Sequence, residues 1–117
     1  MRTIAVVEDD PSMMQGLSRL LSAHGFRVVS FTSAESFLEG APECEAACLV
    51  VDIHLGGISG IDLKRRLKSQ GSDFPVIFMT AVDSEETRRE AVDVGFVAYL
   101  RKPFLAKLLI DAINEVV

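Results

Sequence analysis

The sequence is poor in residues that several classes of protein require. It has no tryptophan, one tyrosine and only two cysteines in 117 residues. Cys44 and Cys48 form a single C-x3-C pair without accompanying histidines, which favours two incidental thiols in a reducing compartment over a zinc site or a disulfide framework. No apolar run reaches the roughly 18–20 residues that a membrane helix needs. We therefore expect a cytoplasmic protein that does not insert into a membrane.

Basic residues are also in deficit, with 12 Lys+Arg against 17 Asp+Glu and a formal net charge of -5. Because polyanions are held by clustered lysine and arginine, this balance argues against direct nucleic acid binding. Hydrophobic residues make up 49% and charged residues 25% of the chain, which is ordinary globular usage. The length predicts one domain, spanning residues 1–117.

Short apolar runs alternate with helical patterns along the chain. Runs such as Ile4–Val7 and Val76–Met79 are apolar throughout, which is typical of parallel strands covered on both faces. Right-handed crossovers then predict an α/β fold, a doubly wound (βα)5 sheet of five parallel strands. The predicted strands are Thr3–Val7, Arg27–Phe31, Cys48–Val51, Pro75–Met79 and Val97–Leu100.

Capping residues punctuate the predicted helices. Asp10-Pro11 places a capping carboxylate before a proline at the first helical position. His24-Gly25 ends that helix, and a protonated His24 would interact favourably with the negative end of the helix dipole. Thr32-x-x-Glu35 indicates a capping box. Further helices are predicted from about Ser59 to Ser69, from near Ser84 to Gly95, and along the apolar stripe Leu105–Val116, which we assign to the core together with Phe104.

Polar residues follow the predicted strands at their carboxyl ends, where open parallel sheets bind ligands. Parallel strands bring these ends to one edge, so carboxylates, a hydroxyl and an ammonium are expected to converge there. The residues concerned are Glu8, Asp9 and Asp10 after the first strand, Asp52 after the third, Thr80 after the fourth, and Arg101-Lys102-Pro103 after the fifth.

The acidic residues of this set have two interpretations. Glu8 and Asp9 could share a hard divalent cation such as Mg²⁺ with Asp52, or they could belong with Asp10 to a capping cluster at the next helix. Asp10 is assigned mainly to capping. A carboxylate such as Asp52 can act as a nucleophile and form an acyl phosphate.

Two further polar residues carry a functional and an ordinary interpretation. Lys102 could offset the charge of a transferring phosphoryl group, or it could be an ordinary surface lysine. Thr80 could donate a hydrogen bond to a phosphoryl oxygen, or it could be structural. The basic runs Lys64–Arg66 and Arg88–Arg89 are interpreted as solvated helix faces, with a docking patch for an acidic partner as the alternative.

Over essentially its whole length, the chain resembles the receiver domains of two-component response regulators. Five segments carry the resemblance, in order and at the expected separations: Val7-Glu8-Asp9-Asp10-Pro11, Val50-Val51-Asp52-Ile53-His54-Leu55, Ser59-Gly60-Ile61-Asp62-Leu63, Met79-Thr80-Ala81 and Tyr99-Leu100-Arg101-Lys102-Pro103-Phe104. The resemblance implies a flavodoxin-like sheet with strand order 2-1-3-4-5. The segment Tyr99–Phe104 is also similar to that of receivers joined to helix-turn-helix transcriptional output domains.

The resemblance implies a role for each site residue. Asp52 aligns with the phosphoryl acceptor and Lys102 with the lysine that contacts the phosphoryl group, its bond to Pro103 typically being cis. Glu8 and Asp9 align with the acidic pair that holds Mg²⁺ (or Mn²⁺), directly or through water. The remaining implied roles are a further metal ligand in the backbone carbonyl of His54, a switch pair in Thr80 and Tyr99, and access to the acceptor beside the small Ala81.

The chain departs from the family pattern in the loop after the acceptor. Gly56-Gly57 stands where the family usually has proline after the position of Leu55, and this pair is expected to make the loop more mobile. Glu8 stands where aspartate is also common, which adds one methylene to the metal contact.

The function implied is a phosphorylation-dependent signalling switch rather than an enzyme in its own right, although such a domain promotes its own phosphotransfer and dephosphorylation. The partners implied are a sensor histidine kinase, an output domain or downstream protein, and a phosphorylation-dependent second copy that uses the fourth helix, fifth strand and fifth helix. A flavodoxin-type electron carrier is disfavoured by the acidic first loop and by the scarcity of aromatic residues that could stack on a flavin. An aspartate-nucleophile phosphatase usually has a second acid where this chain has His54.

Overall fold

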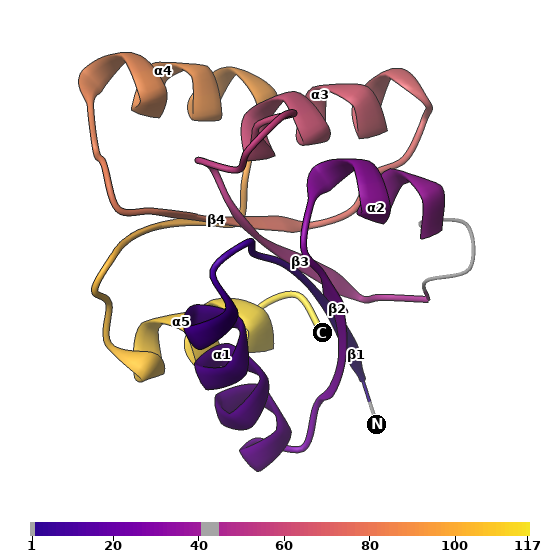
Figure 1. The fold of residues 1–117 in the computed structure, drawn as a ribbon, viewed down its shortest axis with the longest axis vertical. Helices are drawn as coiled ribbons and strands as arrows, with labels where there is room; N and C mark the ends of the chain where they lie inside the picture. The colour runs from indigo at the N-terminus through magenta and orange to yellow at the C-terminus, as the bar shows by residue number, and fades with distance from the viewer. Residues whose placement is uncertain (1, 41–44) are drawn as a thin grey trace.

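The computed structural model describes residues 2–40 and 45–117, and in these ranges five strands alternate with five helices (Figure 1). The predicted alternation is therefore confirmed. The elements are β1 (Thr3–Val7), α1 (Pro11–Ala23), β2 (Arg27–Phe31), α2 (Ala34–Gly40), β3 (Cys48–Asp52), α3 (Gly60–Ser69), β4 (Val76–Thr80), α4 (Glu85–Val94), β5 (Ala98–Arg101) and α5 (Ala106–Asn114).

The strands form one parallel sheet in the order β2-β1-β3-β4-β5. This is the predicted flavodoxin-like arrangement, whose strand order reverses between β1 and β3. Asp52 and Thr80 are the last residues of β3 and β4, so these two strands end one residue later than the apolar runs from which they were predicted. The functional side chains are thus held by the sheet itself at its carboxyl edge.

The apolar runs are buried because helices cover both faces of the sheet. Helices α2, α3 and α4 lie on one face, and α1 and α5 lie on the other (Figure 1). Alternate residues of β1 serve the two cores: Ala5 and Val7 pack into one, while Ile4 and Val6 pack into the other. Every residue of β3 and β4 is buried, as continuous apolar strands require.

The helix caps largely follow the prediction. The Asp10 carboxylate accepts hydrogen bonds from the backbone N–H groups of Ser12 and Met13, and the hydroxyls of Ser59 and Ser84 cap α3 and α4 in the same way. Helix α2 is different.

The capping box predicted at Thr32 and Glu35 is wrong by one residue. The Ser33 hydroxyl accepts a hydrogen bond from the Ser36 backbone N–H at 3.0 Å, and the Ser36 hydroxyl accepts one from the Ser33 N–H at 3.3 Å. Ser33 is therefore the residue that caps α2.

The prediction that the whole stripe of α5 belongs to the core is wrong at two positions. Leu109 and Ile113 are fully buried, whereas Leu105 is 72% and Leu108 is 50% exposed. The apolar stripe is wider than the strip of sheet that the helix covers. Its N-terminal part leaves an apolar surface open to solvent.

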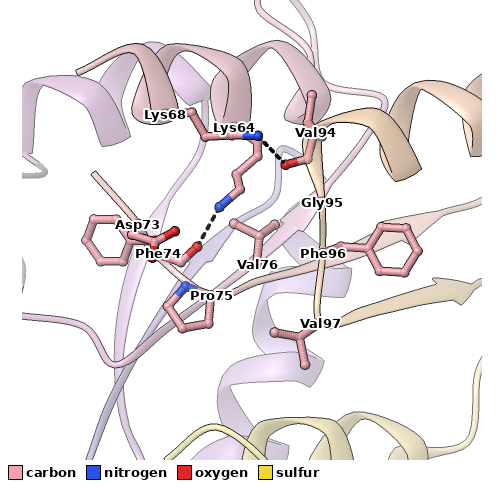
Figure 2. A pocket seen from close by; sticks show the side chains of 10 residues that line it. All are labelled: Lys64, Lys68, Asp73, Phe74, Pro75, Val76, Val94, Gly95, Phe96 and Val97. Atoms are coloured by element: carbon pink, nitrogen blue, oxygen red, sulfur yellow. Dashed lines mark hydrogen bonds between the residues drawn. The ribbon is translucent and has the colours of Figure 1, made fainter. Parts of the chain in front are cut away.

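The interpretation of Lys64 as part of a solvated face is also wrong. Lys64 is only 6% exposed, and its Nζ donates a hydrogen bond to the Phe74 carbonyl at 2.8 Å. Lys68 Nζ donates to the carbonyl of Val94, the last residue of α4, at 3.3 Å. These two lysines lie over a cavity of about 350 Å³ between α3, α4 and the amino ends of β4 and β5 (Figure 2).

Burial lowers the pKa of Lys64, and the carbonyls that the two lysines reach offset their charge. The pair thereby ties α3 to the chain before β4 and to the end of α4.

Two composition-based predictions concern the whole chain. In the described ranges, no helix is both long enough and apolar enough to cross a membrane. Cys48 is a buried free thiol whose pKa is raised to about 12 by burial, while Cys44 lies outside the described residues. Cys48 is therefore an inert packing residue.

Candidate functional site

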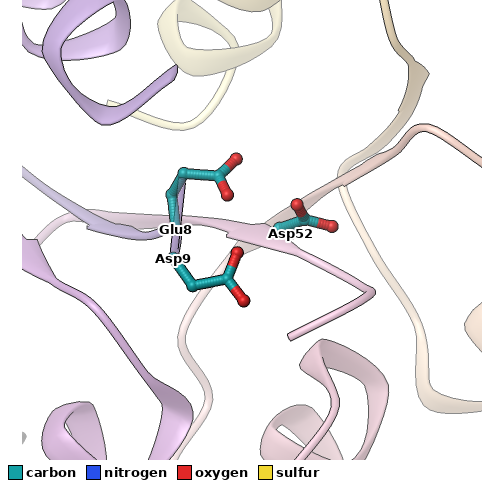
Figure 3. A group of neighbouring side chains, drawn as sticks. All are labelled: Glu8, Asp9 and Asp52. Atoms are coloured by element: carbon teal, nitrogen blue, oxygen red, sulfur yellow. The ribbon is translucent and has the colours of Figure 1, made fainter. Parts of the chain in front are cut away.

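Three carboxylates meet at the carboxyl edge of the sheet (Figure 3). Strand β1 pairs with β3 so that Val7 lies opposite Val51, which places Glu8 beside Asp52. Each of Glu8, Asp9 and Asp52 offers one carboxylate oxygen, and these oxygens lie within 4.8 Å of one another. Such oxygens are the ligands that hard divalent cations prefer.

Lys102 follows the edge strand β5, and its side chain also reaches this cluster. Its Nζ lies 2.8 Å from Glu8 Oε1 and 2.8 Å from Asp52 Oδ2. The backbone fixes its position, because the Lys102 N–H donates to the Thr80 carbonyl at 2.7 Å and the peptide bond to Pro103 is cis, as expected. Lys102 is therefore a component of the site and not an ordinary surface lysine.

The charges of the site are shaped by burial. Glu8 is 1% exposed, and this burial raises its pKa against the opposing effect of the hydrogen bond from Lys102. Burial acts to lower the pKa of Lys102, but the hydrogen bonds and charges of Asp52 and Glu8 outweigh it and the pKa is raised. One ammonium faces three carboxylates, so these four groups together attract a further cation.

The other contacts separate the metal and capping interpretations. Asp10 caps α1 and also donates its backbone N–H to Glu8 Oε2 at 3.1 Å, whereas neither Glu8 nor Asp9 reaches the first turn of the helix. Asp9 Oδ2 instead accepts a hydrogen bond from the Gly56 N–H at 3.3 Å. The arrangement favours a cation-binding cluster over a capping cluster for Glu8 and Asp9.

The loop after Asp52 contacts the Asp52 carboxylate through its backbone. The His54 N–H donates to Asp52 Oδ1 at 2.9 Å, so the two carboxylate oxygens have different partners, His54 and Lys102. Gly57 adopts a φ of +83°, a left-handed conformation that favours glycine. The pair Gly56-Gly57 thus lets the chain turn back towards α3.

Gly60, the first residue of α3, lies directly against the backbone of Asp52 and Ile53. Its N–H donates to the Ile53 carbonyl at 2.9 Å. A Cβ at this position would lie 2.5 Å from the Asp52 carbonyl oxygen and 3.0 Å from the Ile53 Cα. Gly60 belongs to a segment that resembles the family, but its role is not readable from the sequence because the close approach to Asp52 exists only in the folded chain.

Thr80 is fully buried at the end of β4, and its hydroxyl is already engaged. Thr80 Oγ1 donates to the Val82 carbonyl at 2.7 Å and accepts from the Val82 N–H at 3.1 Å. His54 Nε2 lies 3.2 Å from the same carbonyl. Val82 therefore links the loop after β4 to the loop that follows Asp52.

Tyr99 lies on β5 and is held by two charged residues that the sequence analysis did not place in the site. Its hydroxyl donates to Asp83 Oδ1 at 3.0 Å, and the guanidinium of Arg88 lies 5.5 Å from the ring centroid. Arg88 also forms an ion pair with the other oxygen of Asp83. No local pattern reveals these contacts, because Asp83 and Tyr99 are 16 residues apart and belong to different elements.

The pKa of Tyr99 provides a direct test of this arrangement. Burial, followed by the hydrogen bond and charge of Asp83, raises it above the ordinary value of about 10. Because Tyr99 is the only tyrosine and tryptophan is absent, phenolate absorbance follows this one group. We expect a titration midpoint above that of free tyrosine and a lower midpoint in Asp83→Ala.

The sign for stability follows from the same shift. The pKa of Tyr99 is higher in the folded state, so the unfolded state loses the phenol proton first as the pH rises. The contribution of Tyr99 to the free energy of unfolding is therefore present below about pH 10 and is lost as the pH rises further. Circular dichroism of the same samples identifies the range in which the protein stays folded. A midpoint at or below that of free tyrosine within that range would contradict the geometry.

Comparison with known proteins shows extensive similarity. The response regulator receiver domain model matches residues 4–114. The chain is 39% identical over 101 residues to the transcriptional regulatory protein FixJ of Bradyrhizobium diazoefficiens, covering 86% of this chain and 49% of the relative. It is 33% identical over 112 residues to the transcriptional regulatory protein TdiR of Thauera aromatica, covering 96% and 49%.

Solved structures agree with the sequence comparisons. The structure of FixJ-N matches with a TM-score of 0.91 and 31% identity over 99% of this chain and 93% of that one. Full-length FixJ from B. japonicum matches with a TM-score of 0.90 and 36% identity over 98% of this chain and 57% of that one. The chain spans about half the length of the curated relatives it matches.

Proposed function

Because the chain belongs to the response regulator receiver domain family, we propose that it is a phosphorylation switch in which Asp52 accepts a phosphoryl group from a sensor histidine kinase. The observation that carries the proposal is the contact of Lys102 Nζ with Asp52 Oδ2, inside a cluster of three carboxylates. This contact provides a nucleophile and a positive charge at one point on the sheet edge.

The chain's own residues supply the parts that phosphoryl transfer needs. A carboxylate oxygen of Asp52 attacks the phosphorus of a phosphohistidine, and the P–N bond breaks with its electron pair returning to the imidazole of the kinase. The product on this chain is an acyl phosphate. The ammonium of Lys102 offsets charge on the phosphoryl oxygens, and the Thr80 hydroxyl donates to one of them.

The donor set also fits a divalent cation. Glu8, Asp9 and Asp52 supply clustered oxygens, and their charge exceeds that of Lys102. We propose that these residues and the His54 backbone carbonyl hold Mg²⁺ (or Mn²⁺). When bound, the ion supplies positive charge that neutralises the transferring group.

A small phosphodonor tests the function without a kinase. Incubation with acetyl phosphate and Mg²⁺ is expected to add one phosphoryl group per chain, detected by mass spectrometry of the intact protein. Hydroxylamine should remove the group, because it cleaves acyl phosphates and leaves phosphate esters intact. A chain that stays unmodified, or a modification that resists hydroxylamine, would contradict the assignment.

The two alternative functions find less support in the site. In a flavodoxin-type carrier the first loop must accept a phosphate, and here Glu8 and Asp9 would repel it. In a phosphatase, the residue two positions after the nucleophile usually supplies an acid, and here the His54 imidazole turns to the Val82 carbonyl. The curated relatives bear the names of regulatory proteins rather than enzymes.

We further propose that phosphorylation changes association through α4, β5 and α5. The proposed partners are a second copy of this domain and an output domain or downstream protein. The names and greater length of the relatives support the output domain. An interface there is supported by three exposed apolar residues: Leu105 just before α5, Leu108 on α5 and Val92 on α4. The kinase interaction itself would take place in the cytoplasm.

The association surface is tested by Leu108→Glu. With beryllofluoride and Mg²⁺, the unaltered chain is expected to dimerise in sedimentation velocity, and the variant is expected to stay monomeric because it buries a carboxylate in the interface. Gln70→Glu adds the same charge at an exposed position just after α3 and serves as the control. Equal dimerisation of Leu108→Glu and the control would exclude this part of α5.

A further inference from the structure

The two hydroxyls of the proposed switch are held by adjacent residues of one loop. Thr80 Oγ1 donates to the carbonyl of Val82, and Tyr99 Oη donates to the carboxylate of Asp83. The fold thus connects Thr80 at the end of β4 to Tyr99 on β5 through two consecutive residues.

The contact at Asp83 is stronger than a single exposed hydrogen bond. The Asp83 side chain is largely buried, and each of its oxygens has a partner, Tyr99 on one side and Arg88 on the other. The guanidinium of Arg88 also lies over the Tyr99 ring, and this ring packs against Phe96 with the centroids 5.9 Å apart. Asp83 and Arg88 line a cavity of about 270 Å³ beside the first turn of α4.

The hydroxyl of Thr80 has one proton, which it now gives to Val82. To donate to a phosphoryl oxygen on Asp52, it must release the Val82 carbonyl, which removes one hydrogen bond that holds the loop carrying Asp83. We propose that Asp83 is a positioning residue that holds Tyr99 in its resting place and, with Arg88, sets how readily the domain switches. This inference rests on the proposed function.

The test uses the full 117-residue chain and beryllofluoride with Mg²⁺ as the probe. Asp83→Ala removes the acceptor of the Tyr99 hydroxyl and the partner of Arg88. Calorimetric titration is expected to show beryllofluoride binding about three- to tenfold tighter than in the unaltered chain, because one hydrogen bond no longer opposes the switched state. Equal or weaker binding by a folded Asp83→Ala protein would overturn the proposal.

The emission of Tyr99 gives a separate readout of the contact itself, while beryllofluoride affinity reports its role in switching. Tyr99 is the only tyrosine in a chain without tryptophan, and a carboxylate that accepts its hydrogen bond quenches its emission. Without beryllofluoride, Asp83→Ala and Asp83→Asn should both emit more strongly than the unaltered chain, because neither side chain supplies a carboxylate to the Tyr99 hydroxyl. Equal emission from all three would contradict the contact.

Two further variants keep the test decisive. Tyr99→Phe removes the same hydrogen bond without changing the loop, so it should tighten beryllofluoride binding in the same direction, and the double variant should add little. Arg89→Gln breaks the neighbouring exposed pair with Glu85 and should change neither readout. If the unaltered chain fails to bind beryllofluoride at all, the proposed function fails; if it binds and the Asp83 and Tyr99 variants match it, only the role of Asp83 fails.

Discussion

Asp52→Asn is expected to reduce phosphorylation by acetyl phosphate on the order of a thousandfold or more, because the amide has no anionic oxygen to attack phosphorus. The replacement keeps the shape of the side chain and an oxygen that can accept from the His54 N–H. Any residual modification should therefore reflect the loss of the nucleophile and not a rearranged loop. Intact-protein mass spectrometry gives the modified fraction directly.

The same variant should fold normally. Its free energy of unfolding is expected to change by less than about 1 kcal/mol, since the attraction lost with Lys102 and the repulsion relieved with Glu8 and Asp9 oppose each other. Asp62→Asn is the matched control, because Asp62 is an exposed carboxylate on α3 that pairs only with Arg65 at the surface. Undiminished phosphorylation of Asp52→Asn would exclude Asp52 as the acceptor.

Gly60→Ala is expected to have the largest effect of any single-methyl change discussed. The added Cβ would lie 2.5 Å from the carbonyl oxygen of Asp52, and backbone on both sides leaves no flexible group to move aside. Helix α3 must retreat from the end of β3, which is expected to cost about 2 kcal/mol of stability. The same shift displaces Asp52 from Lys102, so the phosphorylation rate should also fall.

Gly16→Ala on α1 is the control for Gly60→Ala, since a Cβ there meets nothing within 4 Å. A glycine-to-alanine change in an open helix position is expected to stabilise the protein by about 0.5–1 kcal/mol. Thermal unfolding compares the two variants. If Gly60→Ala is as stable and as readily phosphorylated as Gly16→Ala, the close approach of α3 to Asp52 contributes neither to stability nor to phosphorylation.

The architecture and the convergence of the site were predictable from the sequence for a physical reason. Strands buried on both faces leave continuous apolar runs, and parallel strands share one carboxyl edge. Residues that end such runs, among them Asp52 and Lys102, must therefore meet. The family resemblance added roles to positions that topology had already brought together.

The contacts that the sequence did not reveal depend on side chains that reach between elements. Arg88 belongs to a charged run that is typical of a solvated face, yet its guanidinium lies over Tyr99 on a neighbouring strand. Lys64 also belongs to a run of basic residues, but its long apolar stem is buried and its ammonium donates to the Phe74 carbonyl. Periodicity records which face a residue occupies and not how far its side chain extends.

Helix ends show a different limit. Thr32 and Ser33 both carry a hydroxyl that can cap a helix, so the pattern leaves a one-residue choice that the local geometry decides. In α5, the apolar stripe predicts a buried face, but the width of that face depends on how much sheet lies beneath the helix. Leu105 and Leu108 pass beyond it.

The order of the strands also has a consequence for folding. Lys102 contacts two carboxylates that lie far from it in the sequence: Glu8 is 94 residues away and Asp52 is 50 residues away. Neither contact can form until β5 has joined the sheet, and contacts between such distant segments form late because closing long loops is entropically unfavourable. The proposed phosphoryl-acceptor site is therefore complete only when the sheet is complete.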